Sequence, residues 1–420
     1  MTFKNNLIAQ SFFSVSGFIL PAILLLFSFQ LISNYFNSEY LSIFLILNTF
    51  ITIGTALDVG LKINLVKTVS TDLKTGKSFI NSLVNYVIII LFLSIFFSLA
   101  IFIFKPYLVQ YYPNFDSKIL NIALTYFCIF FSFHHLAICL PFFYEGLNNF
   151  KNSFQLKLMK SIVTNIFPIF YCIFSNNFDF IYFIKVFTFG QILSLFLMII
   201  YIYFDLKEKF LENEFKIFTF SEIRSTIKLS KHIFLNTLLG ILFVQLISLY
   251  VFSNFKSEVS NIFKIISIIL GYINQFFASI FMIILPIFSN EDFNKLKNKI
   301  SYTFKLNLAL SSVGYTTFVI FITFITNNYN FNQSFDSLGF SFYYLAFGYF
   351  LSTTKYPLVL SAISFEKPQI ISIHNSINFI ICSSIILFRP ANIDTVSLIF
   401  SGSQIVSYFA LITTWRYYFK

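Results

Sequence analysis

The segment 205–231, DLKEKFLENEFKIFTFSEIRSTIKLSK, is the longest stretch of the chain in which charged residues are dense. It carries six basic and five acidic side chains, and almost continuous apolar sequence lies on either side of it. This arrangement predicts a cytoplasmic linker, partly helical, between two membrane-embedded halves at 1–204 and 232–420. The alternative is that the segment is one solvated loop among several, but no other loop approaches its length.

The composition requires a membrane environment. The 420 residues are 57% hydrophobic and only 11% charged, whereas soluble domains carry about 25% charged residues. A compact fold in water cannot cover so much apolar surface, so the bilayer must be the solvent. The four cysteines lie inside apolar runs and form no CxxC pair. Neither a metal site nor a disulfide framework is indicated, and no cofactor is expected.

Apolar runs long enough to cross a bilayer as helices need about 20 residues. Applying that length predicts an all-α integral membrane protein of about 12 transmembrane helices in two six-helix lobes. The expected spans are 7–33, 40–57, 79–104, 119–144, 161–175, 181–204, 232–253, 262–289, 304–326, 338–364, 369–388 and 395–415. Repeats of this kind commonly place a substrate site at the interface between the halves.

The distribution of Lys and Arg predicts the orientation. With the N-terminus in the cytoplasm, 21 of the 28 basic residues fall in cytoplasmic segments and five in outer ones. The other two, Lys264 and Lys355, lie inside apolar runs. This asymmetry favours a multi-pass protein of a bacterial inner membrane with both termini in the cytoplasm.

Polar residues inside the predicted spans are the candidate binding residues, because a buried charge is costly and usually faces a water-filled cavity. Lys264 shares a helical face with Ser267, Gly271, Asn274 and Gln275, which predicts a polar cavity wall. The alternative for Lys264 is that it snorkels to the outer interface. Lys355 lies further from a predicted membrane surface, which favours the cavity.

Three histidines are further candidates. His134 and His135 lie in the middle of one span, and His374 lies at the start of another. Adjacent helical residues point about 100° apart, so at most one of the first pair faces straight into a cavity. Imidazole can titrate near neutral pH and couple to protons. A neutral histidine bonded to a neighbouring span is the alternative for each.

Three motifs resemble one family. They are DVGLKINLVK at 58–67, FYEGLNNFK at 143–151 and LPIFS at 285–289. Together with twelve spans, these stretches are similar to those of the Wzx-type O-antigen and polysaccharide repeat-unit flippases. That group belongs to the polysaccharide transporter family of the multidrug/oligosaccharidyl-lipid/polysaccharide (MOP) exporter superfamily, which also holds multidrug extruders and lipid II flippases.

The resemblance implies two six-helix lobes around a central cavity and a carrier rather than an enzyme. It implies a substrate built as an oligosaccharide on undecaprenyl diphosphate, moved to the outer leaflet by alternating access. A coupling ion, proton or sodium, and partners such as a polymerase and a chain-length regulator would accompany it. Lys264 and Lys355 are candidates for the diphosphate, and Asn274 and Gln275 for sugar hydroxyls. Arginine is absent from the predicted spans, so the resemblance does not identify which cations hold the diphosphate.

Two other functions are alternatives to the flippase. A cation-coupled multidrug extruder of the same superfamily would need an acidic cavity in the first half, but the apolar spans there lack Asp and Glu. An O-antigen polymerase, a glycosyltransferase acting on the same lipid-linked sugars, would be expected to carry a large outer loop. Every predicted outer loop of this chain is short.

Overall fold

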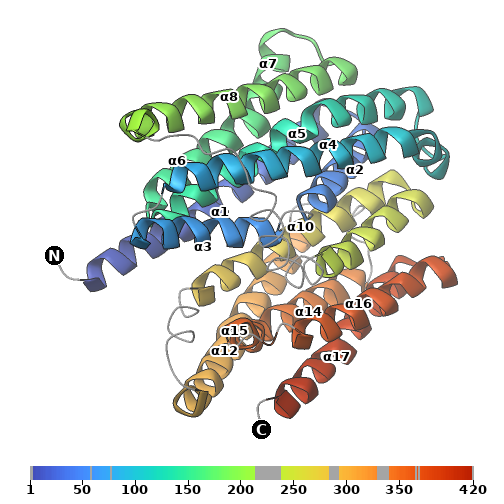
Figure 1. Cartoon of the computed structure of the whole chain (residues 1–420). Coiled ribbons are helices and arrows are strands. Elements are labelled where there is room, and N and C mark those ends of the chain that lie inside the picture. The colour runs from blue at the N-terminus through green and yellow to red at the C-terminus, as the bar shows by residue number, and fades with distance from the viewer. Residues whose placement is uncertain are drawn as a thin grey trace. The chain divides into compact units, whose positions relative to one another are not determined.

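The computed structural model describes residues 3–56, 59–75, 78–212, 238–282, 293–328, 340–364, 367 and 369–418. Within them every regular element is a helix (Figure 1), which confirms the all-α class. The chain forms two compact units, unit 1 (Met1–Phe234) and unit 2 (Leu235–Lys420). Of the predicted linker, residues up to Glu212 continue the last helix of unit 1. The rest of it lies outside the described residues.

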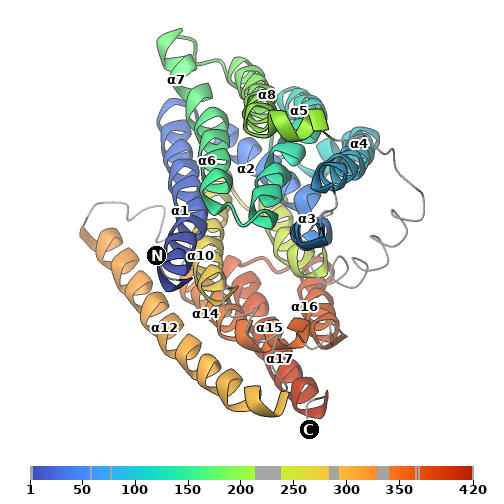
Figure 2. The same cartoon turned by 60° about the vertical axis from the view of Figure 1, so that its left-hand side comes forward.

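Unit 1 is built from long helices that lie side by side. Helix α4 packs along α5, α5 along α8, and α1 along α6, which Figure 2 shows clearly. The predicted loop after the second span contains a helix, α3, which packs against α4 and α5. The elements are α1 (Phe3–Tyr35), α2 (Ser38–Ala56), α3 (Val59–Thr75), α4 (Phe79–Tyr111), α5 (Ser117–Gly146), α6 (Phe150–Ser161), the π-helical turn η1 (Ile162–Ile166), α7 (Phe167–Phe174) and α8 (Phe180–Glu212).

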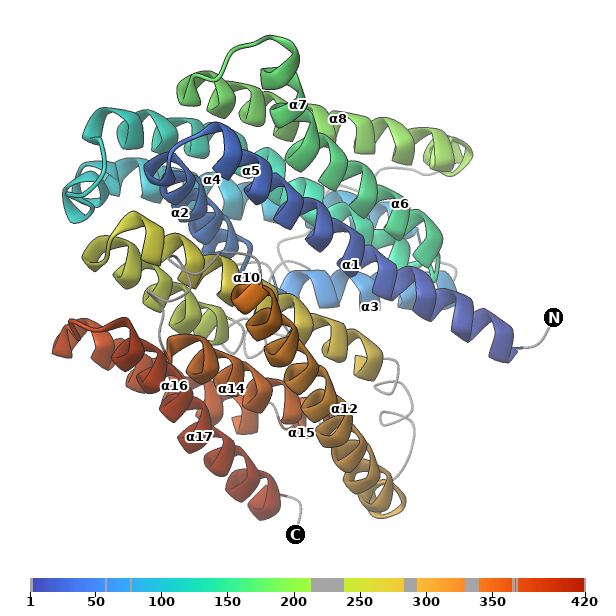
Figure 3. The same ribbon diagram turned by 180° about the vertical axis from the view of Figure 1, so that it is seen from behind.

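Unit 2 contains a helix at Leu238–Asn254 and six labelled helices. Helix α17 packs against both α14 and α16 (Figure 3). The labelled helices are α10 (Ser257–Met282), α12 (Phe293–Asn328), α14 (Ser341–Thr354), α15 (Tyr356–Ser364), α16 (Gln369–Phe388) and α17 (Ile393–Tyr418). The LPIFS motif at 285–289 lies outside the described residues.

The surface of the helices shows that the chain spans a membrane several times. Eight helices in the described part are long and apolar enough to cross a bilayer. The most apolar of them, α4, exposes Phe92, Phe96 and Ile103, whereas Ser94 and Ser98 are buried. Large apolar side chains facing outward, with small polar ones facing inward, fit a lipid solvent. The total of twelve spans stays a prediction.

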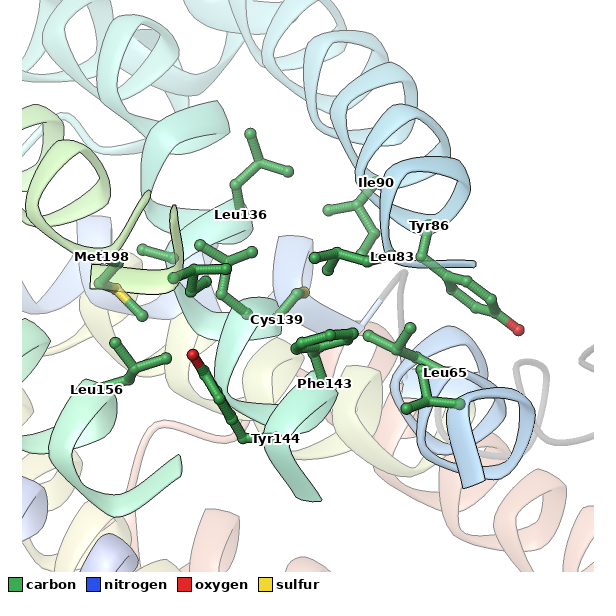
Figure 4. Packing of buried hydrophobic residues seen from close by; sticks show 14 of the residues in the cluster. Leu65, Leu83, Tyr86, Ile90, Leu136, Cys139, Phe143, Tyr144, Leu156 and Met198 are labelled. Carbon is green, nitrogen blue, oxygen red and sulfur yellow. The ribbon is translucent and has the colours of Figure 1, made fainter. Parts of the chain in front are cut away.

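Apolar side chains from five helices fill the interior of unit 1 at one end of α5. Leu61, Leu65 and Val69 of α3 follow one another every four residues, so they lie on one face of that helix and are buried. Figure 4 shows Leu65 beside Phe143 of α5, with Leu83 of α4 next to them. This packing fixes α3 against the end of α5, where the α5–α6 turn begins.

The predicted span 161–175 begins too late. Helix α6 starts at Phe150 and continues through η1 and α7, giving one apolar segment, Phe150–Phe174. Pro168 lacks the N–H that would pair with the Thr164 carbonyl in a regular helix. The chain winds as a π-helix just before it, with Phe167 N donating to Ile162 O. Because α6 contains charged residues, it does not form a uniformly apolar run, and the sequence prediction therefore left it out of the span.

Gly54 of α2 lies against the rings of Phe131 and Phe97. A Cβ at this position would overlap Phe131 Cζ and come within 2.7 Å of Phe97 Cε1. Gly54→Ala is therefore expected to lower the free energy of unfolding by about 1–3 kcal/mol through overpacking. Thermal unfolding of the purified protein measures it. Gly402→Ala is the matched control, because open space surrounds Gly402. Equal melting temperatures of the two variants would contradict the prediction.

Candidate functional site

The α5–α6 turn is the structural form of the FYEGLNNFK motif. Gly146 ends α5, and a Cβ there would lie 2.8 Å from Val69 Cβ, so glycine permits the close approach of α3. Asn148 adopts φ 57°, a conformation that asparagine tolerates. Asn149 then caps α6 by accepting a hydrogen bond from Asn152 N (3.1 Å). The motif thus holds Glu145, at the end of α5, opposite the first turns of α6.

Lysines from two helices gather next to this turn. Lys157 of α6 donates to Glu145 Oε1 (2.7 Å), and Ser153 donates to the same oxygen (3.0 Å). Lys157 Nζ lies 5.3 Å from the centre of the Phe142 ring, and Lys62 Nζ of α3 lies 5.6 Å from that centre. Both lysines therefore meet at one aromatic ring, within cation–π distance. Lys157 Nζ is also 4.3 Å from the centre of the Phe18 ring.

Lys160 completes this group, which we call the lysine cluster (Lys62, Lys157 and Lys160). It is half-buried and lies within electrostatic range of Lys62 and His134. Within the described residues Lys160 makes no hydrogen bond and no ion pair. Glu145 pairs with Lys157. Three lysines beside one carboxylate–lysine pair are suited to bind an anion.

The Glu145–Lys157 ion pair is expected to stabilise unit 1, because the two side chains are only 15% and 12% exposed. Lys157→Ala leaves the carboxylate without its cation and should cost about 2–3 kcal/mol of unfolding free energy. Chemical unfolding in detergent measures the loss. The double variant Glu145→Ala/Lys157→Ala should recover part of it, and Lys151→Ala, exposed on the same helix, should change nothing. A Lys157→Ala protein as stable as Lys151→Ala would refute this role.

The two adjacent histidines reach different helices. His134 Nδ1 donates to Gln191 Oε1 of α8 (2.8 Å), and His135 Nδ1 pairs with Ser94 Oγ of α4 (2.6 Å). Both rings are buried. Because Gln191 Oε1 can only accept, the Nδ1 of His134 carries the proton and its Nε2 presents a lone pair. That Nε2 is buried and has no hydrogen-bond partner among the described residues. His134 lies within electrostatic range of Lys160 and Lys62.

The two lysines predicted from the sequence lie inside unit 2. Lys264 of α10 is 3% exposed and donates to Gln245 Oε1 (2.7 Å) and Ser248 Oγ (3.3 Å) of the helix Leu238–Asn254. Lys355 is 6% exposed and donates to Gln404 Oε1 of α17 (2.9 Å). Both ammonium groups are therefore buried beside neutral amides, and Lys264 does not reach out to an interface.

Lys355 sits at a break in a helix. It is the one residue between α14 and α15, and Pro357 follows two residues later. Proline has no N–H to offer the Thr353 carbonyl. Asn307 of α12 fills that role, because its Nδ2 donates to Thr353 O (2.9 Å) and Thr354 O (3.2 Å). The predicted span 338–364 is thus two helices joined at a braced turn.

The remaining predicted site residues differ in their surroundings. Asn274 bonds to Ser352 Oγ (3.4 Å) and to Thr353 Oγ1 (3.2 Å), so it joins α10 to α14. Gln275, the next residue, is exposed. His374 of α16 is buried, and its Nδ1 donates to Ser407 O (3.1 Å). The predicted polar stripe on α10 is therefore divided between an inward face with Lys264 and Asn274 and an outward position at Gln275.

The lysine cluster was missed from the sequence. All its members fall in segments predicted to be cytoplasmic loops, where lysines are expected in any case. The signal that could have revealed it is the spacing of Lys157 and Lys160 on a helix that starts at Phe150, after the cap residue Asn149. Only the packing of α3 beside α5 brings Lys62 to them.

Comparison with solved structures finds the same fold over nearly the whole chain. The MATE multidrug transporter DinF-BH, in a complex with a ligand, has a TM-score of 0.76 at 14% identity, covering 98% of this chain and 95% of that one. The lipid II flippase MurJ in an inward closed conformation has a TM-score of 0.67 at 19% identity, covering 96% and 87%. A MOP-superfamily transporter from Pyrococcus furiosus, described as having a binding pocket of reverse polarity, has a TM-score of 0.63 at 11% identity, covering 99% and 96%.

The chain therefore has the fold of the MOP-superfamily transporters, a class of multi-pass membrane carriers. No family model matches the sequence, and no curated protein matches it significantly.

Proposed function

We propose that the chain is a flippase that moves an undecaprenyl-diphosphate-linked oligosaccharide, an O-antigen or capsule repeat unit, to the outer leaflet of the inner membrane. The observation that carries the proposal is the lysine cluster of unit 1. Three lysines that gather beside one turn, with Glu145 paired to Lys157, favour an anionic ligand over a cationic one. A diphosphate is the group of such a substrate that needs cations most when it leaves water.

Each member of the cluster has a part in this proposal. Lys160, which has no partner in the described residues, binds a phosphate oxygen directly. Lys157 exchanges some of its contact with Glu145 for the second phosphate. Lys62 approaches from α3 across the Phe142 ring. In the predicted orientation the cluster lies toward the cytoplasm, on the side where the lipid-linked sugar is assembled. The diphosphate therefore binds there first.

The rest of the transport cycle follows the sequence predictions. Twelve spans with both termini in the cytoplasm form two lobes, and alternating access driven by a coupling ion, proton or sodium, carries the substrate across. No covalent step is involved, so the chain is a carrier and not an enzyme. A polymerase and a chain-length regulator are the proposed partners on the outer side. Lys264 and Lys355 are engaged by amides within unit 2. We therefore assign the diphosphate to the lysine cluster, and we give Lys264 and Lys355 only a secondary role in binding the substrate.

Multidrug extrusion is the second candidate, because one of the structures with this fold is that of a multidrug transporter in a complex with a ligand. The sign of the charge argues against it. A cationic drug would be repelled by the lysine cluster, and Glu145, the carboxylate seen beside it, is already paired with Lys157. An O-antigen polymerase is disfavoured by the short predicted outer loops.

The deciding experiment uses a strain deleted for the gene. Lipid-linked repeat units are tested for access to an impermeant sugar-modifying reagent in right-side-out spheroplasts. Single units trapped on the cytoplasmic side support the flippase. Units that reach the outer leaflet but stay unpolymerised point to a polymerase. No accumulation, with new sensitivity to cationic dyes, points to an extruder.

A further inference from the structure

The ammonium group of Lys355 has fewer partners than its burial requires. Its bond to Gln404 Oε1 (2.9 Å) is the one hydrogen bond that it makes within the described residues. The side chain is 6% exposed, so water does not surround the two N–H groups that remain. A buried ammonium is stable only when paired or neutralised.

Beside it lies a second donor without an acceptor. Gln404 is 1% exposed, and its Nε2 is buried with no hydrogen-bond partner in the part of the chain that the structure describes. Its Oε1 faces Lys355, so the amide nitrogen on the same carbon lies next to the ammonium. Two neighbouring buried side chains thus have N–H donors that no acceptor in the described residues uses.

The surrounding helices supply no negative charge to this place. In the described residues Lys355 forms no ion pair with a carboxylate. His374 of α16 is within electrostatic range, and its Nδ1 donates to Ser407 O (3.1 Å). Its Nε2 faces Asn378 Nδ2 (3.5 Å), which is a donor, so the ring is held in the neutral form with its proton on Nδ1.

Lys264, the other buried lysine of unit 2, is different. Its ammonium donates to both Gln245 Oε1 and Ser248 Oγ. In the described part of the chain, neither of these partners has a buried polar side-chain atom without a hydrogen bond. Lys264 therefore uses two of its three N–H donors, whereas Lys355 uses one and its partner Gln404 has an unused donor as well.

We infer that Lys355 Nζ and Gln404 Nε2 bind a monatomic anion, chloride under ordinary ionic conditions, inside unit 2. The anion accepts hydrogen bonds from both groups and neutralises the ammonium. A monatomic ion is favoured over a phosphate because His374, Gln404 and Lys355 are at most 6% exposed. The anion braces the turn between α14 and α15 against α17. This inference does not depend on the proposed substrate.

The test measures thermal unfolding of the purified full-length protein while chloride is replaced by gluconate at constant ionic strength. The wild type is expected to melt about 2 °C or more higher for each tenfold rise in chloride above the dissociation constant. Lys355→Met and Gln404→Leu should lose this dependence. Lys264→Met is the matched control and should keep it. The same melting temperature in chloride and gluconate for the wild type overturns the inference.

A second variant keeps the inference testable if the first ones do not fold. Gln404→Glu has nearly the same shape and places a carboxylate against Lys355, so the protein carries its own counter-charge. It is expected to melt at a temperature independent of chloride and above that of the wild type in gluconate. Chloride dependence that persists in Gln404→Glu overturns the site. Stabilisation of the wild type by inorganic phosphate but not by chloride overturns the monatomic anion.

Discussion

A strain that carries Lys160→Met is expected to export lipid-linked repeat units roughly ten- to hundred-fold more slowly while its level of folded protein stays normal. A charge-assisted hydrogen bond to a phosphate is worth about 1.5–3 kcal/mol, which is this range in rate or affinity. Stability should be unchanged or slightly higher, because Lys160 has no partner among the described residues and is repelled by Lys62. The measurement is the fraction of repeat units accessible to the impermeant reagent.

Two substitutions separate the charge of Lys160 from its shape and its position on α6. Lys160→Arg keeps a cation and should retain most of the export. Lys151→Met makes the same change at an exposed position of the same helix and should export normally. If Lys160→Met exports at the wild-type rate with equal protein in the membrane, the lysine cluster is not where the diphosphate binds. The function would then need another site.

Asn307→Ala is expected to destabilise unit 2 strongly. Asn307 is fully buried, and its amide supplies donors to the carbonyls of Thr353 and Thr354. Removing it takes the amide donor from both buried carbonyls and leaves Thr353 O with the backbone N–H of Lys355 alone. The expected cost is about 2–4 kcal/mol in unfolding free energy. Thermal or chemical unfolding of the purified protein in detergent measures the loss.

The reason for that loss can be tested by changing Pro357. Pro357→Ala restores an N–H that can pair with the Thr353 carbonyl in a continuous helix. Asn307→Ala should therefore be less damaging in the Pro357→Ala background than in the wild type. Ser312→Ala, at a partly exposed position on α12 where the hydroxyl bonds to its own helix, is the control and should be neutral. An equal loss in both backgrounds would show that Asn307 acts through packing instead of through these carbonyls.

The two units hold their lysines in different ways. In unit 1 Lys157 pairs with a carboxylate, while Lys160 has neither an ion pair nor a hydrogen bond in the described residues. In unit 2 each buried lysine is held by the side chain of a glutamine, Gln245 or Gln404. A lysine without a partner at the end of a helix is available to a substrate. A lysine enclosed by a neutral amide instead needs a neutralising ion or partner of its own.

The sequence by itself determined the class of the fold. Helices in a bilayer must satisfy their own backbone groups, so long apolar runs can only be helices. The helices α1, α2, α4, α5 and α8 accordingly cover the runs predicted for unit 1. The FYEGLNNFK motif is likewise local, because Gly146, Asn148 and Asn149 set the α5–α6 turn through their own backbone preferences.

Only the tertiary structure decided which polar residues meet. Charges inside apolar runs predict Lys264 and Lys355 as site residues, but their partners Gln245 and Gln404 lie on other helices. Lys160 lies in a polar stretch, where the sequence does not indicate what a lysine faces. Lys62 reaches Phe142 because Leu61, Leu65 and Val69 bury α3 against α4 and α5. Such contacts join residues far apart in the chain, and side-chain packing, not local preference, determines them.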